Sequence, residues 1–188
     1  VTSSGTCKKT SLSNFSRPRK GGIIAIELRG DDRLVGVEIT SGEHEILLFS
    51  SAGKSIRFRE SDVRSVGRTA IGVRGIRLAD GDKVVSLIVA EATDPILTAT
   101  EKGYGKRTNL DEYRTQARGG SGVISIKTSK RNGKVVGAIQ VTDEDEMMLI
   151  SNKGTLVRAR SSDVSIIGRN TQGVTLINIA KDEELVSV

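Results

Sequence analysis

The chain repeats one pattern of turns and apolar runs four times, with a period of about fifty residues. Turn glycines recur at Gly5, Gly53, Gly103 and Gly154, and a second set recurs at Gly22, Gly72, Gly122 and Gly173. An apolar run ends at Val35, Val85, Val136 and Val186. Three landmarks in one register indicate a solenoid, a propeller or a similar array. We therefore expect one domain made of four units, at residues 1–44, 45–94, 95–144 and 145–188.

The second unit shows the strand pattern most completely. Its apolar and alternating stretches have the two-residue period of β-strands, and no stretch keeps the 3.6-residue period of a helix for more than a turn or two. The expected elements are strands at 45–50, 55–59, 73–78 and 83–89, a tight turn at 51–54, an irregular stretch at 60–71 and a hairpin turn at 80–82. Four strands per unit is the blade pattern of a propeller. We predict an all-β, propeller-like array of about four four-stranded blades that cover one another's faces.

Both ends of the chain fall inside a unit. Residues 1–4 hold only the tail of a first strand, and Val188 stands in the last strand of its unit. We expect a fragment of a longer array, the alternative being an array that closes by joining its two ends. The chain has no tryptophan, so its core must be aliphatic. With one cysteine, Cys7, and no apolar run of about 18 residues, we expect a cytoplasmic protein without disulfides.

No residue pattern in the chain points to catalysis, a metal or a cofactor. The single histidine, His44, has no histidine partner and only a distant cysteine, so a metal site or a Cys–His or Ser–His pair is not expected. Residues 53–55 resemble the end of a phosphate-binding loop, but Leu48 stands where that motif needs glycine. We predict a binding module.

Positive charge recurs at one position of the repeat. The chain has 29 Lys and Arg against 23 Asp and Glu, a net charge of +6, which favours a polyanionic partner. Four residues after each first-set glycine stands a cation: Lys9, Arg57, Arg107 and Arg158. In a radial array this position would form a basic stripe around the rim, suited to the phosphates of a bent duplex. Changing Arg57, Arg107 and Arg158 together to glutamate should then abolish binding without unfolding the array. The expected DNA-binding residues are Lys8, Lys9, Lys54, Arg57, Arg59, Arg68, Lys106, Arg107, Arg118, Arg158, Arg160 and Arg169.

Several long strings resemble the family of C-terminal domains of DNA gyrase A, across essentially the whole chain. They are residues 72–78 (GVRGIRL), 81–88, 103–108 (GYGKRT), 122–127 (GVISIK) and 168–174 (GRNTQGV). The resemblance implies a β-pinwheel, a propeller-like disc whose blades exchange a strand with their neighbours, usually with six blades. It also implies a module that binds and bends duplex DNA around a basic rim, largely without sequence specificity.

The resemblance places the chemistry outside this chain. The parent would be an ATP-dependent type IIA topoisomerase that introduces negative supercoils, an A2B2 assembly of gyrase A with gyrase B. Its catalytic tyrosine, Mg²⁺ and ATP sites would lie elsewhere, because Tyr104 and Tyr113 do not match the setting of the nucleophile. No catalytic residue, metal or cofactor is therefore expected within residues 1–188.

One motif of the family is incomplete. The family carries a basic heptapeptide, Gln-basic-Arg-Gly-Gly-basic-Gly, in its first blade. The nearest string here is 116–122 (QARGGSG), a degenerate box with two of three cations missing, and it stands in the third unit; its matching residues are Gln116, Arg118, Gly119, Gly120 and Gly122. An intact box would lie upstream of Val1. The alternatives are the C-terminal domain of the corresponding topoisomerase IV protein and, more weakly, a protein-binding propeller, which should expose aromatic or methionine anchors.

Overall fold

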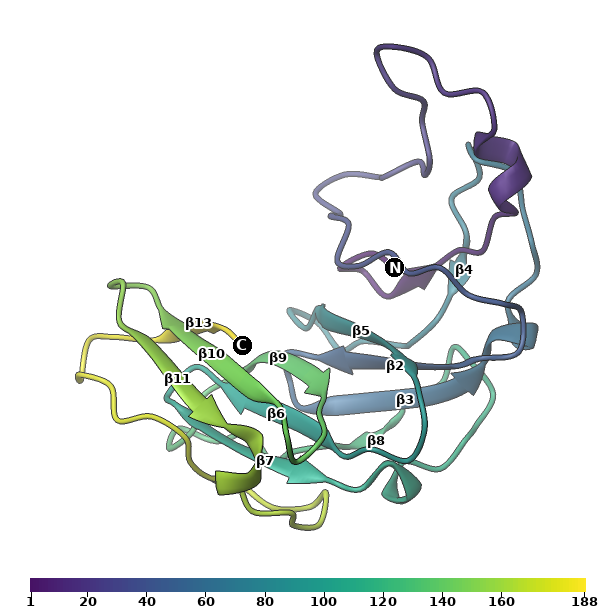
Figure 1. Ribbon diagram of the computed structural model, residues 1–188. Coiled ribbons are helices and arrows are strands. Elements are labelled where there is room, and N and C mark those ends of the chain that lie inside the picture. The colour runs from purple at the N-terminus through teal and green to yellow at the C-terminus, as the bar shows by residue number, and fades with distance from the viewer.

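The computed structural model describes residues 1–188 as an array of short antiparallel strands with four single turns of 3₁₀ helix (Figure 1). The strands are β1 (Thr6–Cys7), β2 (Glu45–Ser50), β3 (Lys54–Arg59), β4 (Val73–Arg74), β5 (Val84–Ala90), β6 (Ile96–Thr100), β7 (Tyr104–Thr108), β8 (Val123–Ile124), β9 (Val135–Gln140), β10 (Glu146–Ser151), β11 (Leu156–Arg160), β12 (Val174–Thr175) and β13 (Leu185–Ser187). The 3₁₀ turns are η1 (Leu12–Phe15), η2 (Glu60–Asp62), η3 (Leu110–Glu112) and η4 (Ser161–Asp163).

Each unit after the first lends a strand to the unit before it. The strand orders are β1-β4, β5-β2-β3-β8, β12-β7-β6-β9 and β11-β10-β13. Thus β4 of the second unit pairs with β1, β8 of the third with β3, and β12 of the fourth with β7. We call the lent strands and the three residues that follow each of them the rim segments; they are residues 73–77, 123–127 and 174–178. The sheets follow one another in an open curve (Figure 1), and the strand exchange that the resemblance implied is confirmed.

The core lies between neighbouring sheets, and β2 shows why its sequence is a continuous apolar run. Ile46 and Leu48 pack with Cys7 on the side of the first unit. The alternate residues Leu47 and Phe49 pack on the other side, in a cluster shared with the third unit. Because both faces of the sheet are covered, β2 has no solvent face on which polar residues could alternate.

The two glycine landmarks mark the ends of the lent strand. Gly122 has φ +69°, and a Cβ there would lie 2.2 Å from the carbonyl oxygen of Ser55 in the preceding unit. Gly53 has φ +83°, and its Cβ would lie 2.3 Å from the carbonyl oxygen of Ile126. A side chain is excluded at both positions by the left-handed backbone and by the neighbouring strand. The repeat period therefore comes from the exchange of strands between units.

The third strand of the unit is shorter than expected. The sequence predicts a strand at 73–78, but β4 ends at Arg74 because the N–H groups of Gly75 and Ile76 both donate to the carbonyl of Gly5, at 2.8 and 3.3 Å. Two donors on one acceptor break the ladder, as in a β-bulge. The other predicted strands of the unit are confirmed as β2, β3 and β5, within one residue at their ends.

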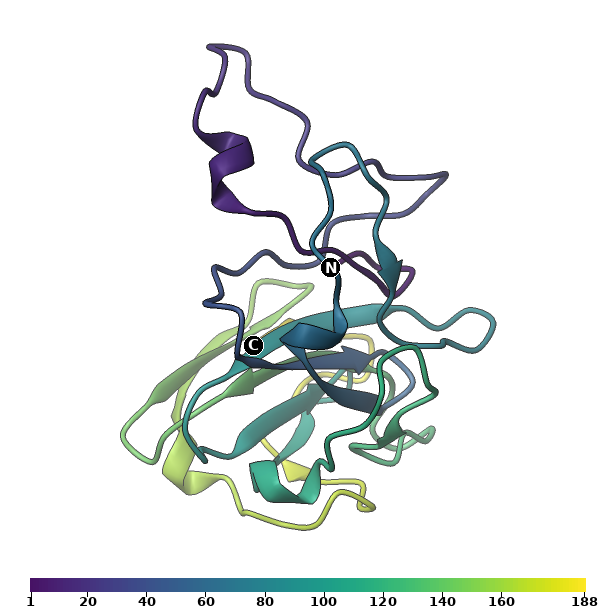
Figure 2. The ribbon, with the colours of Figure 1, turned by 90° about the vertical axis from the view of Figure 1, so that its right-hand side faces the viewer.

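The first unit departs from the four-strand pattern. It contains β1, η1 and an isolated bridge between Thr2 and Leu34, and its remaining residues follow an irregular path. This segment extends away from the sheets in both views (Figures 1 and 2). The first unit contributes only to the two-stranded sheet β1-β4, as expected for an incomplete unit, and the last sheet, β11-β10-β13, has three strands, so the four-stranded pattern is complete in the two middle sheets.

Candidate nucleic-acid interface

The cation four residues after the turn glycine fastens one unit to the next. Arg57 donates from Nη1 to the carbonyls of Leu110 and Tyr113, at 2.9 and 3.1 Å. Arg107 donates from Nε to the carbonyl of Val164 at 2.8 Å. In each pair the acceptor lies in or beside the 3₁₀ turn of the following unit, where a helix end leaves carbonyls without partners. In the second and third units the repeated cation is therefore a structural contact between blades.

The other two members of this position differ in exposure. Lys9 donates to the carbonyl of Glu60 at 3.1 Å and also faces its carboxylate. The side chain of Arg158 is 67% exposed and is paired only with Glu146. The expectation of an outward-facing stripe at this position is therefore wrong for Arg107, which is 5% exposed, and for Arg57, whose donors are directed at the next unit.

A second predicted cation, Lys106, is also inside the fold. It is 0% exposed, and its ammonium donates to the carbonyls of Gly168 and Arg169, at 2.6 and 2.5 Å, and to the Thr171 hydroxyl at 3.1 Å. Lys8 occupies the same position in the first unit and donates to the carbonyl of Arg68. Both lysines hold the irregular loop of the following unit; the expectation that Lys106 faces outward is wrong, whereas Lys8 is half-buried and DNA contact by it stays a prediction.

The buried ammonium of Lys106 gives the fold a pH dependence. Burial lowers the pKa of Lys106 to about 8; the nearby Glu112 opposes the shift and Arg169 adds to it. Between about pH 8 and the ordinary lysine value, the unfolded chain holds a proton that the folded chain has released, so the stability contributed by this group rises with pH in that window. We expect the free energy of unfolding of the unaltered chain, minus that of Lys106→Met, to increase from about pH 8 to about pH 10. The measurement is urea unfolding of the two proteins across this pH range. If their free energies of unfolding change with pH in the same way, this assignment is wrong.

Three further arginines donate hydrogen bonds to backbone carbonyls at the same place of the repeat, which in two cases is a lent strand. The Nη1 groups of Arg68, Arg118 and Arg169 donate to the carbonyls of Ile24, Arg74 and Ile124, at 2.9, 3.0 and 2.7 Å. Each acceptor lies one unit earlier than its donor, at the same place in the repeat. These arginines are half-buried. Part of each guanidinium is thus committed to protein carbonyls, and DNA contact by these residues stays a prediction.

The degenerate box forms part of this support. Its loop docks on the preceding unit through the N–H of Gly119, which donates to Gly75 O at 2.6 Å, and through Gly120 O, which accepts from the N–H of Arg77 at 2.8 Å. The Nε of Arg118 also donates to Asp62 O at 2.8 Å. The same backbone bond recurs one unit later, from Lys127 N–H to Thr171 O at 2.8 Å. The loop therefore connects the third unit to the second through hydrogen bonds.

The remaining predicted cations are exposed. Lys54 begins β3 and lies opposite Ile124 of the lent strand β8. Arg59 and Arg160 end β3 and β11, and acidic residues follow both in the 3₁₀ turns: Glu60, Asp62 and Asp163. Positive charge at that end of the strands is therefore mixed with negative charge, whereas Lys54 lies beside the rim.

The rim segments carry cations that the search for repeated positions missed. Arg74 lies in β4, and Arg77 and Lys127 stand five residues after Gly72 and Gly122; all three are exposed. The corresponding residues of the first and fourth units are Glu27 and Asn178. The repeat position of Arg77 and Lys127 is basic in only two of the four units, so a requirement for a cation in every unit does not find it. The sequence feature that could have indicated it is the fifty-residue step from Arg77 to Lys127, combined with the outer position that strand exchange gives these residues.

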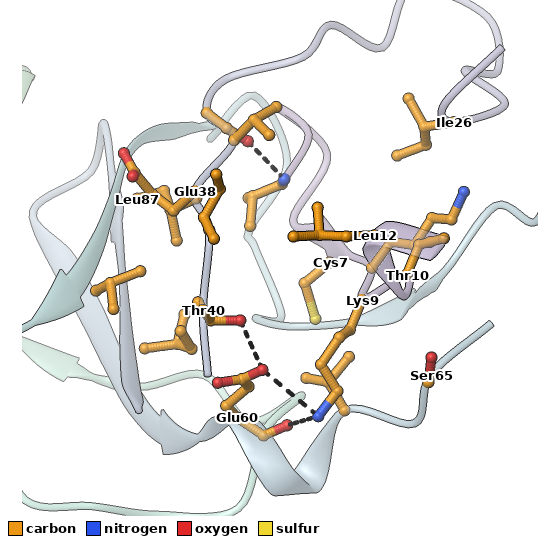
Figure 3. Close-up of a pocket in the computed structure, with 18 of the residues that line it drawn as sticks. Cys7, Lys9, Thr10, Leu12, Ile26, Glu38, Thr40, Glu60, Ser65 and Leu87 are labelled. Carbon is orange, nitrogen blue, oxygen red and sulfur yellow. Dashed lines mark hydrogen bonds and ion pairs between the residues drawn. The ribbon is translucent and has the colours of Figure 1, made fainter. Parts of the chain in front are cut away.

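A hollow of about 580 Å³ lies between the first unit and the second sheet. Its lining is mostly apolar, and within it Glu60 accepts from the Thr40 hydroxyl at 2.6 Å and faces Lys9 at 3.7 Å (Figure 3). Burial opposes ionisation of Glu60, but hydrogen bonds from Thr40 and the N–H of Gly42 hold its pKa below the ordinary value. The buried carboxylate of the hollow is therefore already bonded within the fold.

The described chain also has no group of three His, Cys, Asp or Glu side chains placed to hold a metal. None of its helical turns has the length and apolar character needed to cross a bilayer.

The comparisons with known proteins agree with this architecture. A family model described as "DNA gyrase C-terminal domain, beta-propeller" matches residues 1–41, 44–91, 94–142 and 145–188. The DNA gyrase A protein of Salmonella typhimurium strain LT2 is 59% identical over 188 residues, which are 100% of this chain and 21% of the relative. The chain thus spans about a fifth of the length of that curated relative.

Two solved structures resemble the whole chain. A DNA gyrase A C-terminal domain has a TM-score of 0.89 at 31% identity, with 100% of this chain and 62% of that structure covered. The C-terminal domain of a DNA topoisomerase IV has a TM-score of 0.94 at 29% identity, with 100% and 59% covered. The fold does not separate the two enzymes, but the sequence identity to gyrase A and the family match along all four units do. The chain belongs to the DNA gyrase C-terminal domain family of β-propellers.

Proposed function

We propose that this chain is a DNA-wrapping module, which binds duplex DNA along its rim and bends it, largely without reading sequence. The observation that carries the proposal is the exposed position of Arg74, Arg77 and Lys127 in the rim segments, which are lent between blades, in a chain of net charge +6. Contacts of cations with phosphates depend on charge and not on base identity. A curved row of such contacts also offsets the energy of bending the duplex.

The predicted cations that remain exposed extend this rim. We infer that Lys54 lies on the same path as Lys127, since its strand neighbour Ile124 is three residues from Lys127. Arg59, Arg158 and Arg160 are exposed and remain candidate contacts, with acidic neighbours that weaken their field. The half-buried Arg68, Arg118 and Arg169 can approach phosphate only with the part of the guanidinium that does not hold the rim.

In the whole protein, we propose, this module serves an ATP-dependent topoisomerase that introduces negative supercoils, with gyrase B and a second copy of gyrase A as partners. The four units would form one domain, and ATP and Mg²⁺ would bind in other parts of the assembly. The support is the family to which the chain belongs and the bacterial relative reported above, which also points to the cytoplasm as the compartment.

The rim assignment is tested by salt dependence. Binding of the chain to a duplex of about 150 bp should weaken steeply between about 50 and 200 mM salt, because each phosphate neutralised by the protein contributes about 0.9 to the slope of log K against log [salt]. We expect the variant Arg74→Gln/Arg77→Gln/Lys127→Gln to reduce that slope by up to about 2.7, measured by fluorescence anisotropy or filter binding.

The matched control replaces three exposed cations in the hairpin turns of the first, second and fourth units, Arg33→Gln/Lys83→Gln/Lys181→Gln, and should leave the slope nearly unchanged. Equal slopes for the rim variant and the unaltered chain would remove these three residues from the interface. Binding that does not change with salt would overturn the proposed function itself.

Topoisomerase IV is the second candidate, favoured by the TM-score of 0.94. The two proposals differ in what the DNA does after binding. Ligation of nicked circles in the presence of the chain should shift their linking number in proportion to bound protein if the module wraps DNA as we propose. Binding without any linking-number shift would favour a module that guides DNA without wrapping it.

A further inference from the structure

The hairpin turn between the rim segment and the next inner strand differs in the third unit. In the other units this turn carries a carboxylate that accepts from a serine hydroxyl in the turn beside it. Asp32 accepts from Ser3 and Asp82 from Ser51, both at 2.8 Å, and Glu183 accepts from Ser151. These three turns are therefore fixed by a carboxylate of their own.

The third unit exchanges the two partners. Glu101 stands where the serine would be, and its carboxylate accepts from the N–H of Lys134 at 2.8 Å. Asn132 stands where the acid would be; it is 0% exposed, and its amide donates to the carbonyls of Lys127 and Gln172, at 2.8 and 3.0 Å. The turn itself thus carries an uncharged residue in place of the acid, and the carboxylate that holds it belongs to the turn beside it. We call residues 127–134 the basic turn, because it contains Lys127, Lys130, Arg131 and Lys134 and no acidic residue.

Contacts with the adjacent turn and with β7 hold the basic turn in place on the third blade. Gly133 has φ +74° and packs against Glu101, which fixes the backbone. Arg131 lies over the ring of Tyr104, with its Cζ 5.0 Å from the ring centroid. Tyr104 belongs to β7 and pairs there with Thr175 of the lent strand β12. A guanidinium stacked in this way is oriented before any ligand arrives.

The basic turn also lies where the rim lacks charge of its own. The rim segments of the second and third units supply Arg74, Arg77 and Lys127, whereas that of the fourth unit offers Thr175 and Asn178 at the corresponding places. Arg131 stands beside that uncharged strand through its contact with Tyr104. The cations of the basic turn therefore continue the charged row onto the third blade.

We propose that the basic turn is a phosphate-contacting site for duplex DNA, which carries the DNA path from the rim segments β4 and β8 across the third blade. The proposal rests on the proposed DNA-wrapping function and adds a specific site to it. The ligand is the duplex backbone, since Lys127 belongs to both the turn and the rim. An acidic protein segment could bind the cations of the basic turn alone. It would not require that these cations form one continuous row with Arg77, as a duplex backbone does.

The test compares two triple variants of the chain on the same duplex of about 150 bp. Lys130→Gln/Arg131→Gln/Lys134→Gln removes the three cations of the basic turn that lie outside the rim segment. The control Arg33→Gln/Lys83→Gln/Lys181→Gln removes three cations from the corresponding turns of the other units. We expect the first variant to lower the slope of log K against log [salt] by up to about 2.7 and the control to leave it nearly unchanged. Equal slopes for the two variants would overturn the site, while an unaltered chain that binds without salt dependence would instead overturn the proposed function.

A second measurement keeps the site testable if the triple variant unfolds. An iron–EDTA reagent attached to Arg131→Cys should cleave bound duplex DNA, since the reagent would lie beside the backbone; Cys7 is buried and does not compete for labelling. Cleavage no greater than that of the control Lys181→Cys would overturn the site. Competition by an acidic peptide at equal charge, with no cleavage of DNA, would assign the turn to a protein partner and equally overturn the proposal.

Discussion

An alanine at Gly122 is expected to lower the free energy of unfolding by about 2–5 kcal/mol, which is a large part of the stability of an ordinary domain. The left-handed backbone at φ +69° costs a residue with a side chain about 1–2 kcal/mol. The new Cβ would also lie 2.2 Å from the carbonyl oxygen of Ser55, so the lent strand β8 must move away from β3. Urea unfolding followed by circular dichroism measures the destabilisation.

Gly22 provides the matched control. It stands at the same place in the first unit and has φ +81°, but no atom lies within 4 Å of a Cβ there. Gly22→Ala should therefore cost only the backbone preference, about 1 kcal/mol. If both alanine variants are destabilised by the same free energy, contact with the neighbouring strand is not what requires glycine at this landmark.

Removal of the Arg107 guanidinium should also destabilise the array. In Arg107→Met the carbonyl of Val164 is left without its donor while it remains in a buried setting, and we expect the free energy of unfolding to fall by about 2–3 kcal/mol. The ion pair with Asp143 adds little, because the Asp143 side chain is 75% exposed.

The same repeat position supplies the control in the fourth unit. Arg158 is exposed and paired only with Glu146, so Arg158→Met should change the free energy of unfolding by about 0.5 kcal/mol or less. Denaturant midpoints of the two variants check this difference, and similar destabilisation at both positions would show that the carbonyl contact contributes little. For the same reason, a variant with glutamate at Arg57, Arg107 and Arg158 together is not a clean test of DNA binding, because it would also break contacts between blades.

The sequence was sufficient for the positions of the long strands within a unit. Residues 45–50 and 83–89 have apolar and β-branched patterns that fit few structures other than buried strands, and they form β2 and β5. The length of the third strand was not predictable, because Gly75 and Ile76 share the carbonyl of Gly5, an acceptor about seventy residues away in the chain. No local pattern contains that contact.

The candidate site was predicted less well than the fold. A cation repeated in every unit indicates a common environment, but the sequence does not say whether that environment is solvent or a neighbouring carbonyl. Arg57 and Arg107 donate to carbonyls at the next 3₁₀ turn, whereas Arg77 and Lys127, which are basic in only two units, lie on the outer surface. The exposure of each of these cations depends on the segment that packs beside it, and that segment belongs to another unit.

The sequence alone determined that this chain is a four-fold repeat of β-strands, because glycine spacing and apolar periodicity are local properties of each unit. Only the tertiary structure decided which cations face solvent. Contacts between units make the environment of each side chain depend on residues about fifty positions away. Carbonyls at the next 3₁₀ turn draw Arg57 and Arg107 inward, whereas strand exchange leaves Arg74, Arg77 and Lys127 on the rim.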